Sequence, residues 1–211
     1  MFGKSPDPGA NKGSKISYLV IGVAVAAILV LSTLSVFFYR QAQDYHDAKY
    51  RAQYVIISDI RQHISDAGSY IAVMTYPEET LVSREVVGCG AVLQLEDLSS
   101  LVWAIQEMYL TDSEKNGTFS TLRHAVDILR SHSWDVFVHM QSNRTFDTPW
   151  EENLTLNAEI KTAGSLLVSL LPIIDEGFDY GVDFEKHPYS IVNRLDLQTI
   201  KSTAISIINS F

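Results

Sequence analysis

Near the start of the chain, apolar residues form one long uninterrupted run over Ile16–Tyr39. The run contains no charged residue and no proline, and its only glycine is Gly22. As an α-helix its 24 residues extend roughly 36 Å, which is enough to cross a hydrocarbon layer of ~30 Å with some tilt. The pattern therefore predicts a transmembrane helix over 16–39.

From Arg40 onward, apolar residues recur at alternating steps of three and four, the period of a helix with one buried face. The first helix is expected to continue from the apolar run and to end at Pro77. A short helix is expected over 78–87, interrupted by Gly-Cys-Gly at 88–90, and a second long helix over 91–110. The expected buried positions of the two long helices are Ile57, Ile60, Ile64, Ala67, Ile71, Met74, Ala91, Leu95, Leu98, Val102, Ile105 and Tyr109.

Two more helices are expected after a polar turn at 111–117. The third spans 119–141, and a capping box with a proline at the first helical position opens the fourth at Thr148. Pro172 is expected to kink or end that helix, because proline lacks the backbone N–H and clashes with the preceding turn. The expected buried positions are Leu122, Ala125, Val126, Leu129, Val136, Phe137, Met140, Leu156, Ile160, Ala163, Leu167, Leu170 and Ile174.

The chain ends in a further predicted helix, which follows an acidic and aromatic loop at 176–189. Ser190 or Asn193 is expected to cap this helix, which reaches Ser210. Its expected buried positions are Leu195, Ile200, Ala204 and Ile207.

Strand-like alternation of apolar and polar residues is absent throughout. The sequence thus predicts an all-α protein, in which a single N-terminal transmembrane helix continues into an antiparallel bundle of four to five helices. The expected division is a disordered cytoplasmic tail at 1–15, a transmembrane helix at 16–39 and an extracytoplasmic helical bundle domain at 40–211.

Charge is distributed unevenly along the chain. Lys4, Lys12 and Lys15 outnumber Asp7 in the tail, whereas the remainder carries 13 basic and 24 acidic side chains, a balance of −11. A domain this acidic repels phosphate backbones and anionic headgroups, so nucleic-acid binding is not expected.

Orientation is predicted from the tail lysines and from three glycosylation sequons at Asn116, Asn143 and Asn153. Both features favour a cytoplasmic N-terminus and a domain outside the membrane, although Arg40 and other basic residues flank the far end. A cleaved signal peptide is the alternative, since Ala24-Val25-Ala26 resembles a cleavage site. The apolar run continues too far beyond this point for a signal peptide, which favours an uncleaved anchor.

Three histidines, His124, His132 and His139, lie in the third helix with Asp135. Along the helix axis, only His132, Asp135 and His139 lie near enough to cluster, and these three residues span ~10 Å. No histidine here follows a glutamate by three residues, as helical di-iron sites require, so the histidines are interpreted as a solvated helix edge.

The acidic loop offers oxygen ligands of the kind that calcium prefers. Its spacing does not match an EF-hand, so we expect no metal site, with Asp175, Asp179, Asp183 and Glu185 as weak candidates only.

Cys89 is the only cysteine and no catalytic-cysteine pattern surrounds it, so it is interpreted as a small buried residue. No nucleophile elbow and no phosphate-binding glycine loop is present. The sequence therefore predicts no catalytic residues and no cofactor.

The expected function is that of a non-enzymatic, membrane-anchored interaction module, an accessory or scaffold subunit of a membrane complex. Its expected partners are the lipid bilayer, through 16–39, and another membrane protein or a second copy of the chain. A ligand-binding sensor bundle that signals through a partner is the alternative, and an enzyme is the third hypothesis.

Overall fold

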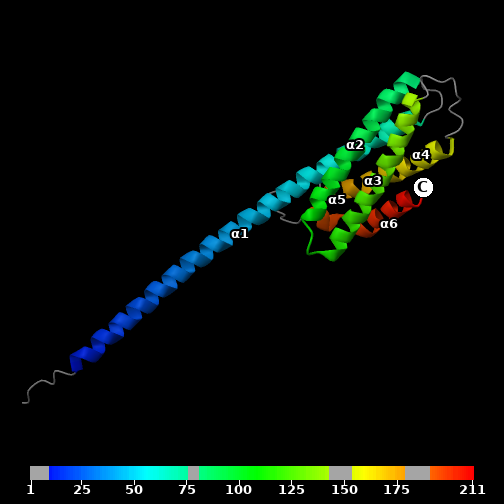
Figure 1. Cartoon of the computed structure of the whole chain (residues 1–211). Coiled ribbons are helices and arrows are strands. Elements are labelled where there is room, and N and C mark those ends of the chain that lie inside the picture. Colours follow the sequence, from blue (N-terminus) through cyan, green and yellow to red (C-terminus); the bar gives the residue numbers. More distant parts are fainter. Residues whose placement is uncertain (1–9, 76–80, 143–153, 179–190) are drawn as a thin grey trace, which may run out of the picture. The chain divides into compact units, whose positions relative to one another are not determined.

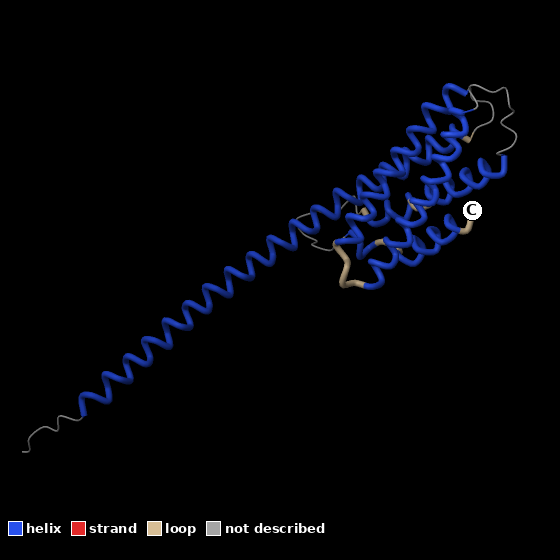
Figure 2. The backbone as a smooth tube through the Cα atoms, in the orientation of Figure 1, coloured by secondary structure: helices blue, strands red, loops and turns tan. Residues whose placement is uncertain are grey.

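The computed structural model describes residues 10–75, 81–142, 154–178 and 191–211, and side-chain environments within 22–75, 86–138, 156–178 and 191–211. Every regular element in these ranges is a helix, as Figures 1 and 2 show, so the all-α prediction is confirmed. The elements are α1 (Ala10–Met74), α2 (Leu81–Glu107), α3 (Ser113–Ser142), α4 (Leu154–Val168), α5 (Leu171–Gly177), the 3-10 helix η3 (Ile191–Arg194) and α6 (Leu197–Ile208).

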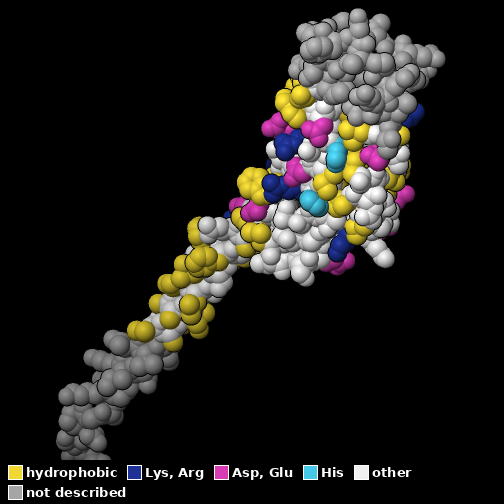
Figure 3. All heavy atoms as spheres, turned by 45° about the vertical axis from the view of Figure 1, so that its right-hand side comes forward, with side chains coloured by type: hydrophobic (Ala, Val, Ile, Leu, Met, Phe, Trp, Pro, Cys, Tyr) yellow, Lys and Arg dark blue, Asp and Glu magenta, His cyan; other side chains and the backbone are white. Residues whose placement is uncertain are grey.

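The chain forms two compact units, 1–49 and 50–211, and α1 contributes residues to both. Within the first unit, α1 begins at Ala10, so the last six residues of the segment expected to be a disordered tail are helical. Every side chain from Gly22 to Arg40 is exposed, and Figure 3 shows the hydrophobic side chains along this part of α1.

By length and composition, two helical stretches of the described chain could cross a membrane. The first lies in Gly22–Met74, and none of its most apolar window is buried. The second is Val86–Glu107, with 39% of its window buried. Leu95, Leu98 and Val102 of this second stretch are fully buried in the second unit, so it serves as a core helix.

In the described residues of the second unit, five of the α-helices pack around one another as a ring. Gly68 of α1 approaches α4, and the same helix contacts α2, where His63 Nδ1 lies 2.6 Å from Gln94 Oε1. Helix α2 packs on α3, α3 packs on α6, and α6 packs on α4, which closes the ring. The order around the bundle is therefore α1, α2, α3, α6, α4.

Neighbouring helices run in opposite directions, with one exception. Trp103 lies beside Arg123 whereas Glu96 lies beside Arg130, so α2 and α3 are antiparallel. The exception is α3 with α6, because His132, late in α3, stacks on Phe211 at the end of the chain. The last helix thus packs on both α3 and α4, which also contact each other, and it runs parallel to α3.

The core of the bundle consists of the apolar stripes that the three-four spacing marks. The predicted positions from Ile57 to Tyr109 are all buried, and so are those from Leu195 to Ile207 and those on the described part of α3. Leu156 of α4 is only partly buried, and the side chain of Met140 lies outside the described residues. Periodicity alone was sufficient to find the buried faces.

Helix α2 corrects the prediction of a break at Gly88-Cys89-Gly90, because it runs through these residues without interruption. A Cβ at Gly88 would lie 3.3 Å from Met74 Sδ, and one at Gly90 would lie 3.2 Å from the Tyr70 ring. No glycine in the described residues has a positive φ. The glycines therefore allow close packing within a continuous helix.

Helix α3 begins at Ser113, within the segment predicted to be a polar turn, because Asp112 caps it. The Lys115 backbone N–H donates to Asp112 Oδ1 at 3.1 Å, and Lys115 Nζ donates to Oδ2 at 2.6 Å. These hydrogen bonds, the side-chain one first, lower the pKa of Asp112. The predicted capping box at Thr148 lies outside the described residues, and α4 ends at Val168, before Pro172 opens α5.

Helix α6 is capped by Asp196, which corrects the prediction of Ser190 or Asn193 as the cap. The Thr199 hydroxyl donates to Asp196 Oδ2 at 2.6 Å and the Thr199 N–H donates to Oδ1 at 3.0 Å. Both bonds favour the carboxylate, and the hydroxyl bond is the larger cause of the lowered pKa of Asp196.

We expect the stabilisation from this cap to be pH-dependent. Because the folded-state pKa is lowered, the stabilisation is present above the ordinary aspartate pKa of about 4 and is lost as the pH falls through the lower, folded value. Thermal midpoints of the wild type and of Asp196→Asn, which keeps a capping oxygen, measure this between pH 3 and 7. The wild type should lose its advantage over the variant at acidic pH, and a constant difference would contradict the assignment.

Candidate functional site

The histidines of α3 do not converge. His124 is exposed, whereas His132 is partly buried and stacks on Phe211 with ring centroids 4.2 Å apart. The side chain of His139 lies outside the described residues. Among the residues that the structure describes, no three His, Cys, Asp or Glu side chains gather to hold a metal ion.

Of the weak calcium candidates, only Asp175 is within the described chain; Asp179, Asp183 and Glu185 lie outside it. Arg61 of α1 forms a bidentate ion pair with Asp175. Its Nε donates to Oδ1 and its Nη2 donates to Oδ2 at 3.2 Å. Tyr54 stacks edge-on against Phe178 beside it, with centroids 5.1 Å apart. Asp175 therefore joins α5 to α1.

Cys89 is exposed, which corrects its interpretation as a buried residue. Gly88 and Gly90 face the neighbouring helices on either side, and successive residues of a helix are rotated by about 100°, so the side chain between them points outward.

Asn116 is the sequon residue within the described chain, while Asn143 and Asn153 lie outside it. Asn116 is partly buried in the first turn of α3, and its Nδ2 donates to the Gln106 carbonyl at 3.4 Å. Thr118 of the same sequon is 2% exposed, so it contributes to packing in the folded bundle.

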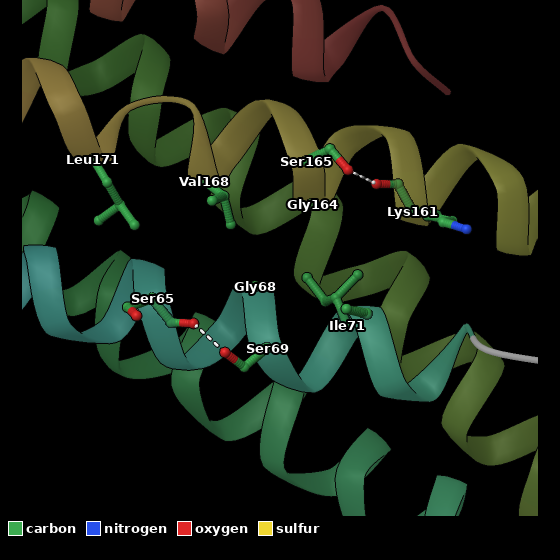
Figure 4. A pocket seen from close by; sticks show the side chains of 10 residues that line it. Ser65, Gly68, Ser69, Ile71, Lys161, Gly164, Ser165, Val168 and Leu171 are labelled. Carbon is green, nitrogen blue, oxygen red and sulfur yellow. Dashed lines mark hydrogen bonds between the residues drawn. The ribbon is translucent and has the colours of Figure 1, made fainter. Parts of the chain in front are cut away.

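A groove of about 430 Å³ lies between α1 and α4, and Figure 4 shows its lining. Its side chains are mostly small, and among the described residues that line it Lys161 is the charged one. The Ser69 hydroxyl donates to the Ser65 carbonyl and the Ser165 hydroxyl to the Lys161 carbonyl, so both donors are occupied within their own helices. The groove has the volume of a ligand site, but it has few polar groups directed at a ligand.

The helices meet closely beneath this groove. A Cβ at Gly68 would lie 2.2 Å from Val168 Cγ2, and one at Gly164 would lie 2.7 Å from Ile71 Cγ2. Each glycine thus accepts a branched side chain of the opposite helix. The small residues of the groove serve this contact between α1 and α4.

The second candidate is a polar and aromatic surface that α2 and α3 build together, here called the α2–α3 face. Its members are Glu96, Ser99, Trp103, Arg123, Asp127, Arg130 and Trp134. The tryptophans, Trp103 and Trp134, are 49% and 50% exposed, a large apolar area for side chains at a solvated surface.

The arginines of the α2–α3 face are only loosely paired. Arg123 Nε lies 3.8 Å from Asp127 Oδ2, and the Arg130 nitrogens lie 3.9 Å from Asp127 and 4.0 Å from Glu96. These distances exceed a hydrogen bond. Ser99 does form one, donating to Asp127 Oδ1 at 2.7 Å. Exposed arginine and tryptophan are the residue types that carry most binding energy at protein interfaces.

Sequence reasoning missed this face, although Arg123, Asp127, Arg130 and Trp134 have the spacing of one helix stripe.

No protein-family model, no curated protein and no solved structure matches the chain.

Proposed function

We propose that the chain is a single-pass membrane protein whose helical bundle is a non-enzymatic interaction module, an accessory or scaffold subunit of a membrane complex. One observation carries the proposal: the helical stretch from Gly22 to Tyr39 is apolar on all sides and its side chains are exposed. A helix that is hydrophobic all round needs a surrounding apolar medium, and a bilayer supplies one over this length.

Details of the stretch suit a bilayer. The Thr33 hydroxyl donates to the Leu29 carbonyl at 2.8 Å, which satisfies a polar group within the apolar segment. Tyr39 ends the segment and Tyr45 follows it, each 69% exposed, and tyrosine is enriched where a membrane helix meets water. The tail lysines and the acidic remainder support a cytoplasmic N-terminus and an outside bundle.

The interior of the bundle favours interaction over catalysis. In the described residues the buried polar side chains are all uncharged, namely Gln53, Ser99, Thr118, Ser133 and Asn157. Catalytic acids and bases are typically ionisable groups held in partly desolvated pockets. Charged and aromatic side chains instead gather on the surface, where Figure 3 shows both signs of charge among hydrophobic groups.

Extraction of the native protein in mild detergent, followed by mass spectrometry of what co-purifies, tests the proposal. We expect a membrane protein in stoichiometric amount, retained at low salt and depleted when Trp103 and Trp134 are both replaced by alanine. Variants with Lys201→Ala and Asp97→Ala, at exposed positions elsewhere, are the matched control and should retain it. A chain that emerges without another protein would contradict the accessory role and favour the sensor alternative, with the α1–α4 groove as the place to seek a ligand.

A further inference from the structure

The two arginines of the α2–α3 face have unused binding capacity. The Arg123 and Arg130 side chains are 42% and 38% exposed, and both lie 3.8 Å or more from the carboxylates beside them. The two residues are seven positions apart, about 10 Å along α3. Trp134 and Trp103 lie at opposite ends of this pair of charges. Asp127 lies between the two arginines and Glu96 lies beside Arg130, so charges of both signs alternate on the face. Its two arginines fit a partner that presents two carboxylates at the same spacing between apolar groups.

This chain presents such a surface on α1. Asp59 and Asp66 are also seven positions apart, on the stripe of α1 that faces away from the core. Asp59 is exposed and makes no ion pair within the described residues, while Asp66 accepts hydrogen bonds from Gln62 Nε2 at 3.0 and 3.1 Å. Val55 and Val73, 56% and 37% exposed, stand at the two ends of the stripe.

We propose that the bundle self-associates, with the Asp59–Asp66 stripe of one copy docking on the α2–α3 face of the next. The inference rests on the proposed function, in that it names a partner for the interaction module. Two carboxylates at a seven-residue spacing can meet two guanidinium groups at the same spacing in either direction, and arginine binds carboxylates with short charged hydrogen bonds. Because the two surfaces differ, the contact is head-to-tail and can continue to further copies.

Charge reversal tests the contact, using the full chain in detergent micelles and its mass by light scattering or sedimentation. Wild type should associate at micromolar concentration in 50 mM salt and dissociate at 500 mM, since added salt screens charge pairs. We expect Asp59→Lys with Asp66→Lys, or Arg123→Glu with Arg130→Glu, to weaken association at least ~tenfold. An equimolar mixture of the two variants should recover it, because each reversed surface then meets its complement.

Controls separate this contact from misfolding and from association through the apolar segment. Lys201→Glu and Asp97→Lys reverse exposed charges elsewhere and should associate like wild type. Arg123→Gln with Arg130→Gln avoids placing new carboxylates beside Asp127 and should also weaken association, with the helix content unchanged by circular dichroism.

A wild type that is monomeric in 50 mM salt, or a mixture of reversed variants that fails to associate, would overturn the inference. If that monomer still co-purifies with another membrane protein, the proposed function stands and only the self-association fails. Conversely, a chain that associates with itself and with nothing else supports the inference and overturns the accessory role.

Discussion

We expect the full chain carrying Ala27→Arg and Leu31→Arg to leave the membrane fraction. Both positions lie near the middle of the apolar segment 16–39, where each arginine costs about 2.5–3.5 kcal/mol of insertion free energy. Two arginines on adjacent turns offset most of the favourable insertion free energy that the flanking valines and leucines contribute. Cell fractionation with an alkaline carbonate wash measures the result.

The control adds the same charge at exposed sites of α6, with Ser202→Arg and Ser206→Arg. This variant should stay in the carbonate-resistant pellet with the wild type. If the Ala27→Arg, Leu31→Arg variant also stays there, the segment does not anchor the protein, and the proposed function fails at its first step.

The second large effect is expected where α1 and α4 meet. Ile71→Ala should destabilise the bundle by about 2–5 kcal/mol, because Ile71 is 1% exposed and its loss leaves a cavity. Gly164→Ala alone should cost about 1–3 kcal/mol through overpacking against Ile71, partly offset by alanine's ~1 kcal/mol better helix propensity. In the Ile71→Ala background the same Gly164→Ala change should become stabilising, since the clashing methyl group is gone.

Urea unfolding of the four proteins, wild type, both single variants and the double variant, gives the coupling free energy directly. Gly117→Ala is the matched control, because a Cβ there meets nothing within 4 Å, and it should be neutral or slightly stabilising. Additive effects of Ile71→Ala and Gly164→Ala would show that the two side chains do not compete for space.

These two predictions differ in what the sequence could foresee. The apolar segment follows from composition alone, since the length and apolarity of a segment are local properties. The pairing of Ile71 with Gly164 could not be, because the two residues are 93 positions apart and nothing local specifies that α4 rather than α3 adjoins α1. From the sequence alone, a glycine within a helix is expected to lower the stability of that helix. Its packing role becomes clear only when the side chain that it accommodates is known.

The candidate interaction surface divides in the same way. The sequence alone shows the helical spacing of one stripe of α3, which consists of Arg123, Asp127, Arg130 and Trp134. That Trp103 covers Arg123 and that Ser99 binds Asp127 follows only from the antiparallel packing of α2 on α3. Asp59 and Asp66 of α1 can be matched to the two arginines only once the structure shows that their stripe faces away from the core.

The sequence by itself determined the helical class, the apolar segment and nearly all buried positions, because one-sided burial repeats at the period of the helix. Only the tertiary structure decided that α2 continues through Gly88 and Gly90, that Cys89 is exposed, that Asp112 and Asp196 cap their helices, and that α6 packs on both α3 and α4. The physical reason is that these features depend on which distant side chains pack beside a residue. Periodicity identifies the buried face of a helix, but it does not identify the residues that pack against that face.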